Sequence, residues 1–155
     1  MNDAPLQPIT HEPGEGEPNA AFGLKRWFRV RADDVDGAFC VFEEEIPEGE
    51  GPPVHIHHEE HELFTVLTGA VRFHCDGVEK TMGAGGTVLI PPGARHAFRG
   101  VGPGPSRVTV MLTPGRGEGF FRDVEAEGLV PGRDKARIDE IAEDYALSFV
   151  GPPLA

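Results

Sequence analysis

The sequence predicts an all-β fold, a barrel or sandwich of short strands, followed by a helical tail. The chain has 155 residues and is rich in glycine and proline, with 21 and 15 copies, which suit tight turns. Its central part alternates short apolar runs with breaks rich in Gly or Pro. From Pro114 onward the apolar spacing changes from that of strands to that of helices.

The strand region contains short segments rich in Val, Phe, Ile and Thr, residues that are common in β-sheets. We expect strands at 24–30, 39–46, 54–57, 63–67, 70–75, 80–82, 87–90, 96–98 and 107–112. Turn-forming clusters such as 83–86 and 91–93 separate them. Many short strands at this rhythm indicate one β-domain, which we place at residues 21–113.

The two ends of the chain differ from this region. Residues 1–20 are rich in Pro, Gly, Glu and Asn and predict a flexible N-terminal arm, which either stays free or crosses to a partner subunit. Residues 114–155 predict a helical extension that packs on the barrel. One apolar set follows the spacing i, i+3, i+4, i+7: Ile138, Ile141, Ala142 and Tyr145. We expect this stripe to pack against the outer face of the barrel.

Charge and cysteine content restrict the partners and the compartment. The formal net charge of −12 disfavours binding to nucleic acid or to anionic membranes, so a small-molecule substrate is expected. Cys40 and Cys75 lie in apolar runs and predict buried, reduced thiols. Reduced thiols, together with the absence of a signal-peptide pattern or a long apolar run, predict a cytoplasmic location.

Histidines and carboxylates cluster at residues 55–62. His55 and His57 are two apart, so a strand points both to one face. Residues 58–61 are polar, and we interpret them as a solvent-exposed hairpin loop that places His57 opposite Glu62. Two imidazoles and a carboxylate on one face form a ligand set suited to iron, manganese, nickel, cobalt or zinc.

A fourth ligand is expected from His96, which follows a turn rich in Pro and Gly. Phe64 and Val66 share the strand face of Glu62, and Phe98 shares that of His96. We therefore expect Phe64, Val66 and Phe98 to line the pocket around the metal.

These residues resemble the two sequence motifs of the cupin superfamily. The first motif, G-x5-H-x-H-x4-E-x6-G, is met by Gly49, His55, His57, Glu62 and Gly69. The second, G-x5-P-x-G-x2-H-x3-N, is met by Gly85, Pro91, Gly93 and His96, with Gly100 in place of the final Asn. The tail is similar to that of small single-domain bacterial cupins described as quercetin-dioxygenase-like.

The resemblance implies a fold, a cofactor and a class of activity. The fold would be the double-stranded β-helix, or jelly roll, of cupins, usually as a homodimer. One divalent metal ion per chain, of iron, manganese, nickel, copper, cobalt or zinc, would be bound by His55, His57, Glu62 and His96. The function would be that of a dioxygenase-like oxidoreductase for a small aromatic or enolisable substrate, with Glu62 as ligand and catalytic base. Two alternatives stay open: a zinc-dependent isomerase or cyclase, and a non-catalytic small-molecule-binding cupin.

Overall fold

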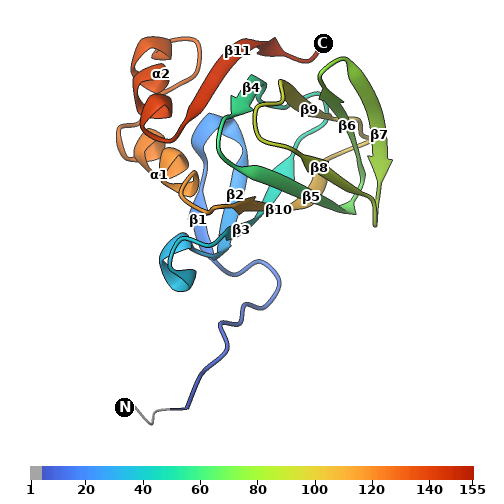
Figure 1. The fold of residues 1–155 in the computed structure, drawn as a ribbon. Coiled ribbons are helices and arrows are strands. Elements are labelled where there is room, and N and C mark those ends of the chain that lie inside the picture. Colours follow the sequence, from blue (N-terminus) through green and yellow to red (C-terminus); the bar gives the residue numbers. More distant parts are fainter. Residues whose placement is uncertain (1–4) are drawn as a thin grey trace.

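The computed structural model describes residues 5–155 and contains two antiparallel sheets in a jelly-roll arrangement (Figure 1). One sheet holds, in spatial order, β1 (Glu17–Asn19), β2 (Lys25–Val30), β3 (Cys40–Ile46), β10 (Ser106–Thr113), β5 (His61–Thr68) and β8 (Thr87–Ile90). The other holds β11 (Leu147–Pro153), β4 (Pro53–His57), β9 (His96–Gly100), β6 (Ala70–Cys75) and β7 (Val78–Gly83). The predicted all-β fold class with a helical tail is confirmed.

The strands form here because their side chains alternate between interior and solvent. In β10 every second residue is buried, and in β5 the buried positions are Glu62, Phe64 and Val66. The facing side chains of the two sheets form one apolar core that includes Phe28, Phe42, Phe64, Phe73, Phe98, Val108 and Val110. Burial of this apolar surface is the main driving force for closing the sheets face to face.

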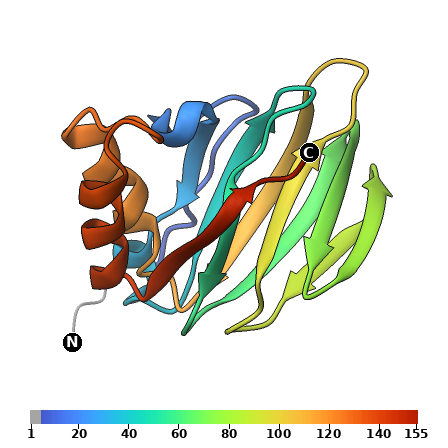
Figure 2. The same ribbon diagram turned by 90° about the horizontal axis from the view of Figure 1, so that it is seen from above.

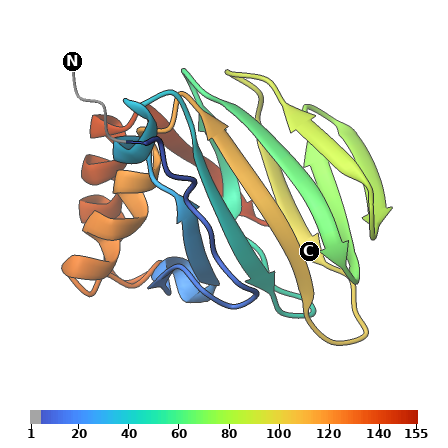
Figure 3. The same ribbon diagram turned by 90° about the horizontal axis from the view of Figure 1, so that it is seen from below.

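The helices lie at one end of the strand layers. They are η1 (Ala21–Gly23), η2 (Ala32–Val35), α1 (Glu118–Ala126) and α2 (Lys135–Asp144). Figures 2 and 3 show α1 and α2 side by side beside β2, at the end opposite to β7. Neither α1 nor α2, the α-helices of the described residues, is long and apolar enough to cross a membrane.

The sequence led us to expect the helical stripe on the outer face of the barrel. In the structure it packs against elements at the edges of the two sheets instead. Ile138, Ile141 and Ala142 of α2 share a second apolar core with α1, η1 and Leu147 of β11. These elements belong to opposite ends of the chain, so their meeting is set by tertiary packing. The tail therefore closes the side of the molecule where β1 and β11 form the edges of the two sheets.

Two edge strands were not expected from the sequence. β1 pairs with β2, so residues 17–19 are part of a sheet; the first four residues of the expected arm lie outside the described residues. β11 pairs with β4, with Leu147 opposite His57 and Phe149 opposite His55. The end of the chain is thereby placed directly beside the strand that carries two candidate metal ligands.

The structure explains why Gly100 stands where the second motif has Asn. A Cβ atom at this position would lie 2.5 Å from the carbonyl oxygen of Pro47. The backbone N–H of Gly100 donates to the carbonyl of Glu50, and its own carbonyl accepts from the N–H of Gly49. The close approach of two backbones therefore favours the residue without a side chain.

Both cysteines carry free thiols, as predicted. Cys40 on β3 is fully buried and Cys75 at the end of β6 is partly buried. Burial raises the pKa of both thiols above its ordinary value. They are therefore packing groups with little thiolate character near neutral pH.

Candidate metal centre

The predicted hairpin between residues 54–57 and 63–67 is wrong, because β4 and β5 lie in different sheets. β4 pairs with β11 and β9, whereas β5 pairs with β10 and β8. The short polar link after His57 carries the chain from one sheet to the other. The inward direction of Glu62 was nevertheless predicted correctly, because the period of two along β5 places it on the same face as Phe64 and Val66.

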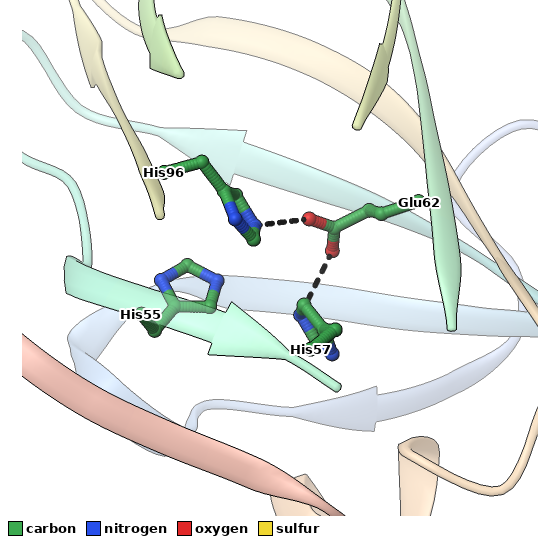
Figure 4. Close-up of side chains that lie close together, drawn as sticks. All are labelled: His55, His57, Glu62 and His96. Atoms are coloured by element: carbon green, nitrogen blue, oxygen red, sulfur yellow. Dashed lines mark hydrogen bonds and ion pairs between the residues drawn. The ribbon is translucent and has the colours of Figure 1, made fainter. Parts of the chain in front are cut away.

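Four side chains meet between the two sheets, as Figure 4 shows. His55 and His57 project from β4, and His96 stands opposite His55 on the neighbouring strand β9. Glu62 projects toward them from β5 in the facing sheet. One nitrogen from each histidine and one carboxylate oxygen all lie within 4.8 Å of one another, and all four residues are buried.

The backbone orients two of the histidines for metal binding. Nδ1–H of His55 donates to the carbonyl of Pro53 at 2.8 Å, and Nδ1–H of His96 donates to the carbonyl of Ala94 at 2.9 Å. A carbonyl oxygen can only accept, so the Nδ1 atom of each ring must carry the hydrogen. The lone pair of a neutral ring is then on Nε2, the atom that is left for a metal ion.

Beside Nδ1 of His57 lies the carboxylate of Glu60, where His55 and His96 have a backbone carbonyl. This Nδ1 forms no hydrogen bond within the described residues and lies 3.5 Å from Oε1 of Glu60. Glu60 is buried, so our interpretation of it as a solvent-exposed loop residue is wrong. Its other oxygen, Oε2, accepts a hydrogen bond from the backbone N–H of Gly117 at 3.1 Å. Gly117 lies far along the chain, so the local sequence held no sign of this contact.

The carboxylate of Glu62 lies between the Nε2 atoms of His96 and His57. Its Oε1 lies 3.0 Å from Nε2 of His96, and its Oε2 lies 3.6 Å from Nε2 of His57. Burial raises the pKa of Glu62, but the charges of His57 and His96 and the hydrogen bond from His96 outweigh it and hold this pKa at about 2. The carboxylate is therefore ionised at neutral pH and points its lone pairs into the cluster.

The histidines titrate differently from one another. Burial, with the charges of His96 and His57, lowers the pKa of His55 to about 3, so its ring is neutral. Burial also lowers the pKa of His57, but the carboxylates of Glu62 and Glu60 raise it by more, so the net shift is upward. The buried carboxylate of Glu62 thus favours positive charge on the neighbouring ring, and a metal cation at this point would be stabilised in the same way.

This donor set fits a divalent metal ion. Three imidazoles and one carboxylate are borderline ligands that suit zinc and the redox-active first-row metals alike. The Nε2 atoms of His57 and His96 face the carboxylate, while His55 and His96 are fixed from behind by backbone carbonyls. Supports of this kind behind the ligands are a regular feature of protein metal sites.

A small apolar cavity of about 40 Å³ adjoins the cluster. His55, His57 and Glu62 line it, together with the expected Phe64 and Phe98. The expected Val66 is buried in the core and is not among the lining residues. The edge elements form another part of the wall, with Phe22 of η1, Phe120 and Phe121 of α1, and Leu147 and Phe149 of β11.

The aromatic wall from the edge elements was not found from the sequence. The ring of Phe22 lies 5.3 Å from that of Phe149 and 5.6 Å from that of Phe120, measured between centroids. The ring of Phe149 in turn lies 6.0 Å from that of His55. The alternation of apolar side chains at Leu147 and Phe149 was the available sign of a strand here, and the prolines that follow obscured it.

A buried ion pair lines the same cavity. Arg26 on β2 and Glu44 on β3 are 1% and 3% exposed, and Nε of Arg26 donates to Oε2 of Glu44 at 2.9 Å. Charged residues are seldom buried unless they are paired, and no sequence pattern marked these two as a pair.

The remaining histidines near the cluster face solvent, as predicted. His58 is exposed and forms a hydrogen bond of 2.8 Å between its Nε2 and Oγ of Ser148. His61 opens β5 and points away from the interior. They are therefore not part of the buried ligand set.

Comparisons with known proteins agree with this architecture. The family model described as the cupin domain matches residues 42–112, the stretch that contains all four clustered side chains. A search of curated proteins found no match.

Several solved structures share the fold. An RmlC-like cupin from Shewanella frigidimarina is 20% identical, with a TM-score of 0.60, over 71% of this chain and 94% of that one. A predicted oxalate decarboxylase from Thermotoga maritima is 19% identical, with a TM-score of 0.55, over 58% and 79%. The Cnp3 cupin domain of Schizosaccharomyces pombe is 19% identical, with a TM-score of 0.54, over 58% of this chain and 64% of that one, which is less than two thirds of its length. At these identities the likeness concerns the fold, a jelly roll of cupin type.

Proposed function

We propose that this chain of cupin fold is a metal-dependent, dioxygenase-like oxidoreductase that acts on a small aromatic or enolisable molecule. The observation that supports the proposal is the position of the cluster of three histidines and one glutamate. It lies at the wall of an apolar cavity, so a molecule in the cavity would contact the ligand side chains directly. The fold alone would not justify an activity, because cupin-like barrels can serve several functions.

The ligands in this proposal are His55, His57, Glu62 and His96. A bound ion would supply a positive charge that binds an enolate or phenolate oxygen, and a redox-active ion would also permit reaction with dioxygen. His55 and His96 would hold it with Nε2, because their Nδ1 atoms are bonded to backbone carbonyls. These fixed rings would keep the ligand geometry when a substrate enters.

Glu62 has the additional role of accepting a proton in this proposal. Its two oxygens face different rings, Oε1 toward His96 and Oε2 toward His57. Glu62 would help to hold the ion and would also be placed to take the proton that a substrate hydroxyl or activated C–H group loses. Glu62 is ionised at neutral pH, so it has a free lone pair with which to accept such a proton.

The aromatic side chains would exclude water from the reaction. Phe64 and Phe98 lie next to the ligands with their rings 5.3 Å apart, and Phe149 closes the side of His55. A site with little water strengthens the attraction between charges and protects reactive species from side reactions.

A zinc-dependent isomerase or cyclase is the second candidate function. The observation in its favour is that the same four ligands suit zinc as well as they suit iron or manganese. The identity of the bound metal separates the two candidates, because zinc has no redox chemistry.

The test is elemental mass spectrometry of untagged protein purified without chelators. We expect about one metal ion per chain in the native protein, because residues 5–155 contain one four-residue cluster of this kind. A double variant, His57→Ala with His96→Ala, is expected to lose it. His61→Ala, which removes an exposed histidine from the same region, is the matched control and should keep it.

The metal found then directs the activity assay. With iron, manganese, nickel or copper, we expect oxygen uptake with catechol or pentane-2,4-dione as probe substrates. Zinc at the same stoichiometry, without oxygen uptake after iron loading, would favour the isomerase or cyclase. If no metal binds even after reconstitution, the proposal fails and a non-catalytic binding protein remains.

A further inference from the structure

Glu44 is a buried carboxylate with one oxygen that the protein does not use. Its Oε2 accepts the hydrogen bond from Arg26, whereas Oε1 is buried and has no hydrogen-bond partner among the described residues. Glu44 lines the same cavity as His55, His57 and Glu62. A buried acceptor without a partner costs free energy, so a molecule in the adjoining cavity that brings a donor to it gains affinity.

The guanidinium of Arg26 balances the negative charge of Glu44. Besides its bond to Glu44, Arg26 donates through Nη1 to Oδ1 of Asn19 at 2.7 Å and to the carbonyl of Ala21 at 2.9 Å. Its guanidinium also stacks on the ring of Phe121, with Cζ 4.1 Å from the centroid. Because the pair has no net charge, the cavity favours a neutral donor such as a hydroxyl or N–H group. An ammonium group would leave one positive charge in excess in an apolar site.

The walls next to Glu44 are aromatic. The rings of Phe42 and Phe121 lie 5.6 Å apart in an edge-to-face arrangement, and both line the cavity. Phe64 and Phe98 pack in the same manner near the metal ligands. A flat ring is the shape that such walls contact well.

We propose that Glu44 determines substrate specificity by accepting a hydrogen bond from a neutral hydroxyl or N–H group on a small aromatic molecule. The inference rests on the proposed function in that it concerns the same cavity, and it specifies the chemical class of the occupant. Glu44 would hold the polar group of the molecule, and Arg26 would fix the direction of the carboxylate.

The test compares the binding of three probes by ligand-observed NMR titration. Phenol carries the donor, fluorobenzene has a similar shape without a donor, and benzylammonium carries a charged donor. One hydrogen bond to a buried carboxylate corresponds to roughly a tenfold or larger difference in Kd, so we expect phenol to bind at least about tenfold more tightly than fluorobenzene. Equal binding of these two, or tighter binding of benzylammonium, would overturn the proposal.

The variant Glu44→Gln tests the residue itself. Arg26 needs an acceptor, so the amide oxygen should turn to Arg26 and the amide N–H should face the cavity. We expect the preference for phenol to fall several-fold, and benzonitrile, which only accepts, to bind more tightly than in the native protein. The matched control is Glu43→Gln on the same strand, because Glu43 pairs with Arg29 and Arg107 and does not line the cavity. Unchanged preferences in folded Glu44→Gln would contradict the assignment.

A further arm separates this inference from the proposed function. The double variant His57→Ala with His96→Ala lacks two ligands of the cluster but keeps Glu44 and Arg26. We expect its preference for phenol over fluorobenzene to persist, even if metal binding or oxygen uptake has failed. Loss of the preference in this variant would show that phenol binds through the metal cluster, which would overturn the role of Glu44. If Glu44→Gln does not fold, the probe series in the double variant His57→Ala with His96→Ala still decides the question, because Glu44 is intact there and the metal cluster is not.

Discussion

The carboxylate of Glu60 lies behind the ring of His57, with Oε1 3.5 Å from Nδ1, and is held there by the backbone N–H of Gly117. A carboxylate behind a metal-binding imidazole keeps the hydrogen on the distal nitrogen and makes the other nitrogen a better ligand. The loop before β5 and the start of α1 therefore act together on one ligand. A Cβ at Gly117 would lie 2.4 Å from Oε1 of Glu60, so a larger residue here would displace the carboxylate from its position behind His57.

We predict that Glu60→Gln weakens metal affinity about ten- to a hundredfold. The amide oxygen would keep the hydrogen bond from Gly117, and the amide N–H would then face Nδ1 of His57. This favours the tautomer with hydrogen on Nε2, which cannot bind the ion. Competition titration with a chromophoric chelator measures the effect. Glu59→Gln, at the exposed neighbouring position, is the control, and equal affinity of the two variants would refute the role of Glu60.

The stability of the metal-free protein should depend on pH through His55. Its pKa is about 3 in the fold and 6.5 in the unfolded chain, so below pH 6.5 the unfolded state binds a proton that the folded state does not bind. The free energy of unfolding should therefore fall as the pH is lowered from 6.5, by up to about 1.4 kcal/mol per pH unit. Glu62 adds a loss of the same sign only below its unfolded value of 4.5.

Urea denaturation at pH 6.5, 5.5 and 4.5 in the presence of a chelator measures this dependence. His55→Gln removes the titrating group and should give a flatter profile over this range. His57 does not interfere, because its raised pKa leaves it protonated in both states below pH 6.5. The same slope in the native protein and in His55→Gln would exclude His55 as the source.

The sequence identified the ligands because spacing alone determines which way a strand residue points. His55 and His57 had to share a face, and Glu62 had to share one with Phe64. The pairing of strands was not determined in this way. The link after His57 is compatible with a hairpin and with a crossing between sheets, and only the packing of both sheets decides between them.

Contacts between distant segments were beyond prediction for a related reason. Phe149 reaches His55 because the last strand pairs with β4, and Glu60 is buried because Gly117 binds it. In both cases the partner lies far along the chain, and neither residue has a local pattern that marks it as part of a site. Buried charges such as Arg26 are likewise indistinguishable in sequence from exposed ones.

We predict that Asn19 stabilises the fold, because its side chain links the edge strand β1 to α1 and to Arg26 in the wall of the cavity. Its Nδ2 donates to the carbonyl of Phe121 and to Glu125, and its Oδ1 accepts from Arg26 and from the N–H of Ala21. Asn19→Ala removes two buried hydrogen bonds, from Arg26 and from the N–H of Ala21, and should lower the free energy of unfolding by about 1–3 kcal/mol. Urea denaturation checks this, with the exposed Glu15→Ala as control. A loss no larger than in the control would contradict the structural role.

Gly100→Asn restores the residue of the second cupin motif, yet we predict that it destabilises this chain. The new Cβ would lie 2.5 Å from the carbonyl oxygen of Pro47, and the adjoining backbone hydrogen bonds to Gly49 and Glu50 leave that carbonyl little freedom to move. Forcing a side chain into such a contact costs about 1–3 kcal/mol in typical proteins. Gly83→Asn is the matched control, because a Cβ at Gly83 meets nothing within 4 Å. Urea denaturation of the two variants measures the difference, and equal stability would show that the strand at Gly100 can move away from Pro47 without loss.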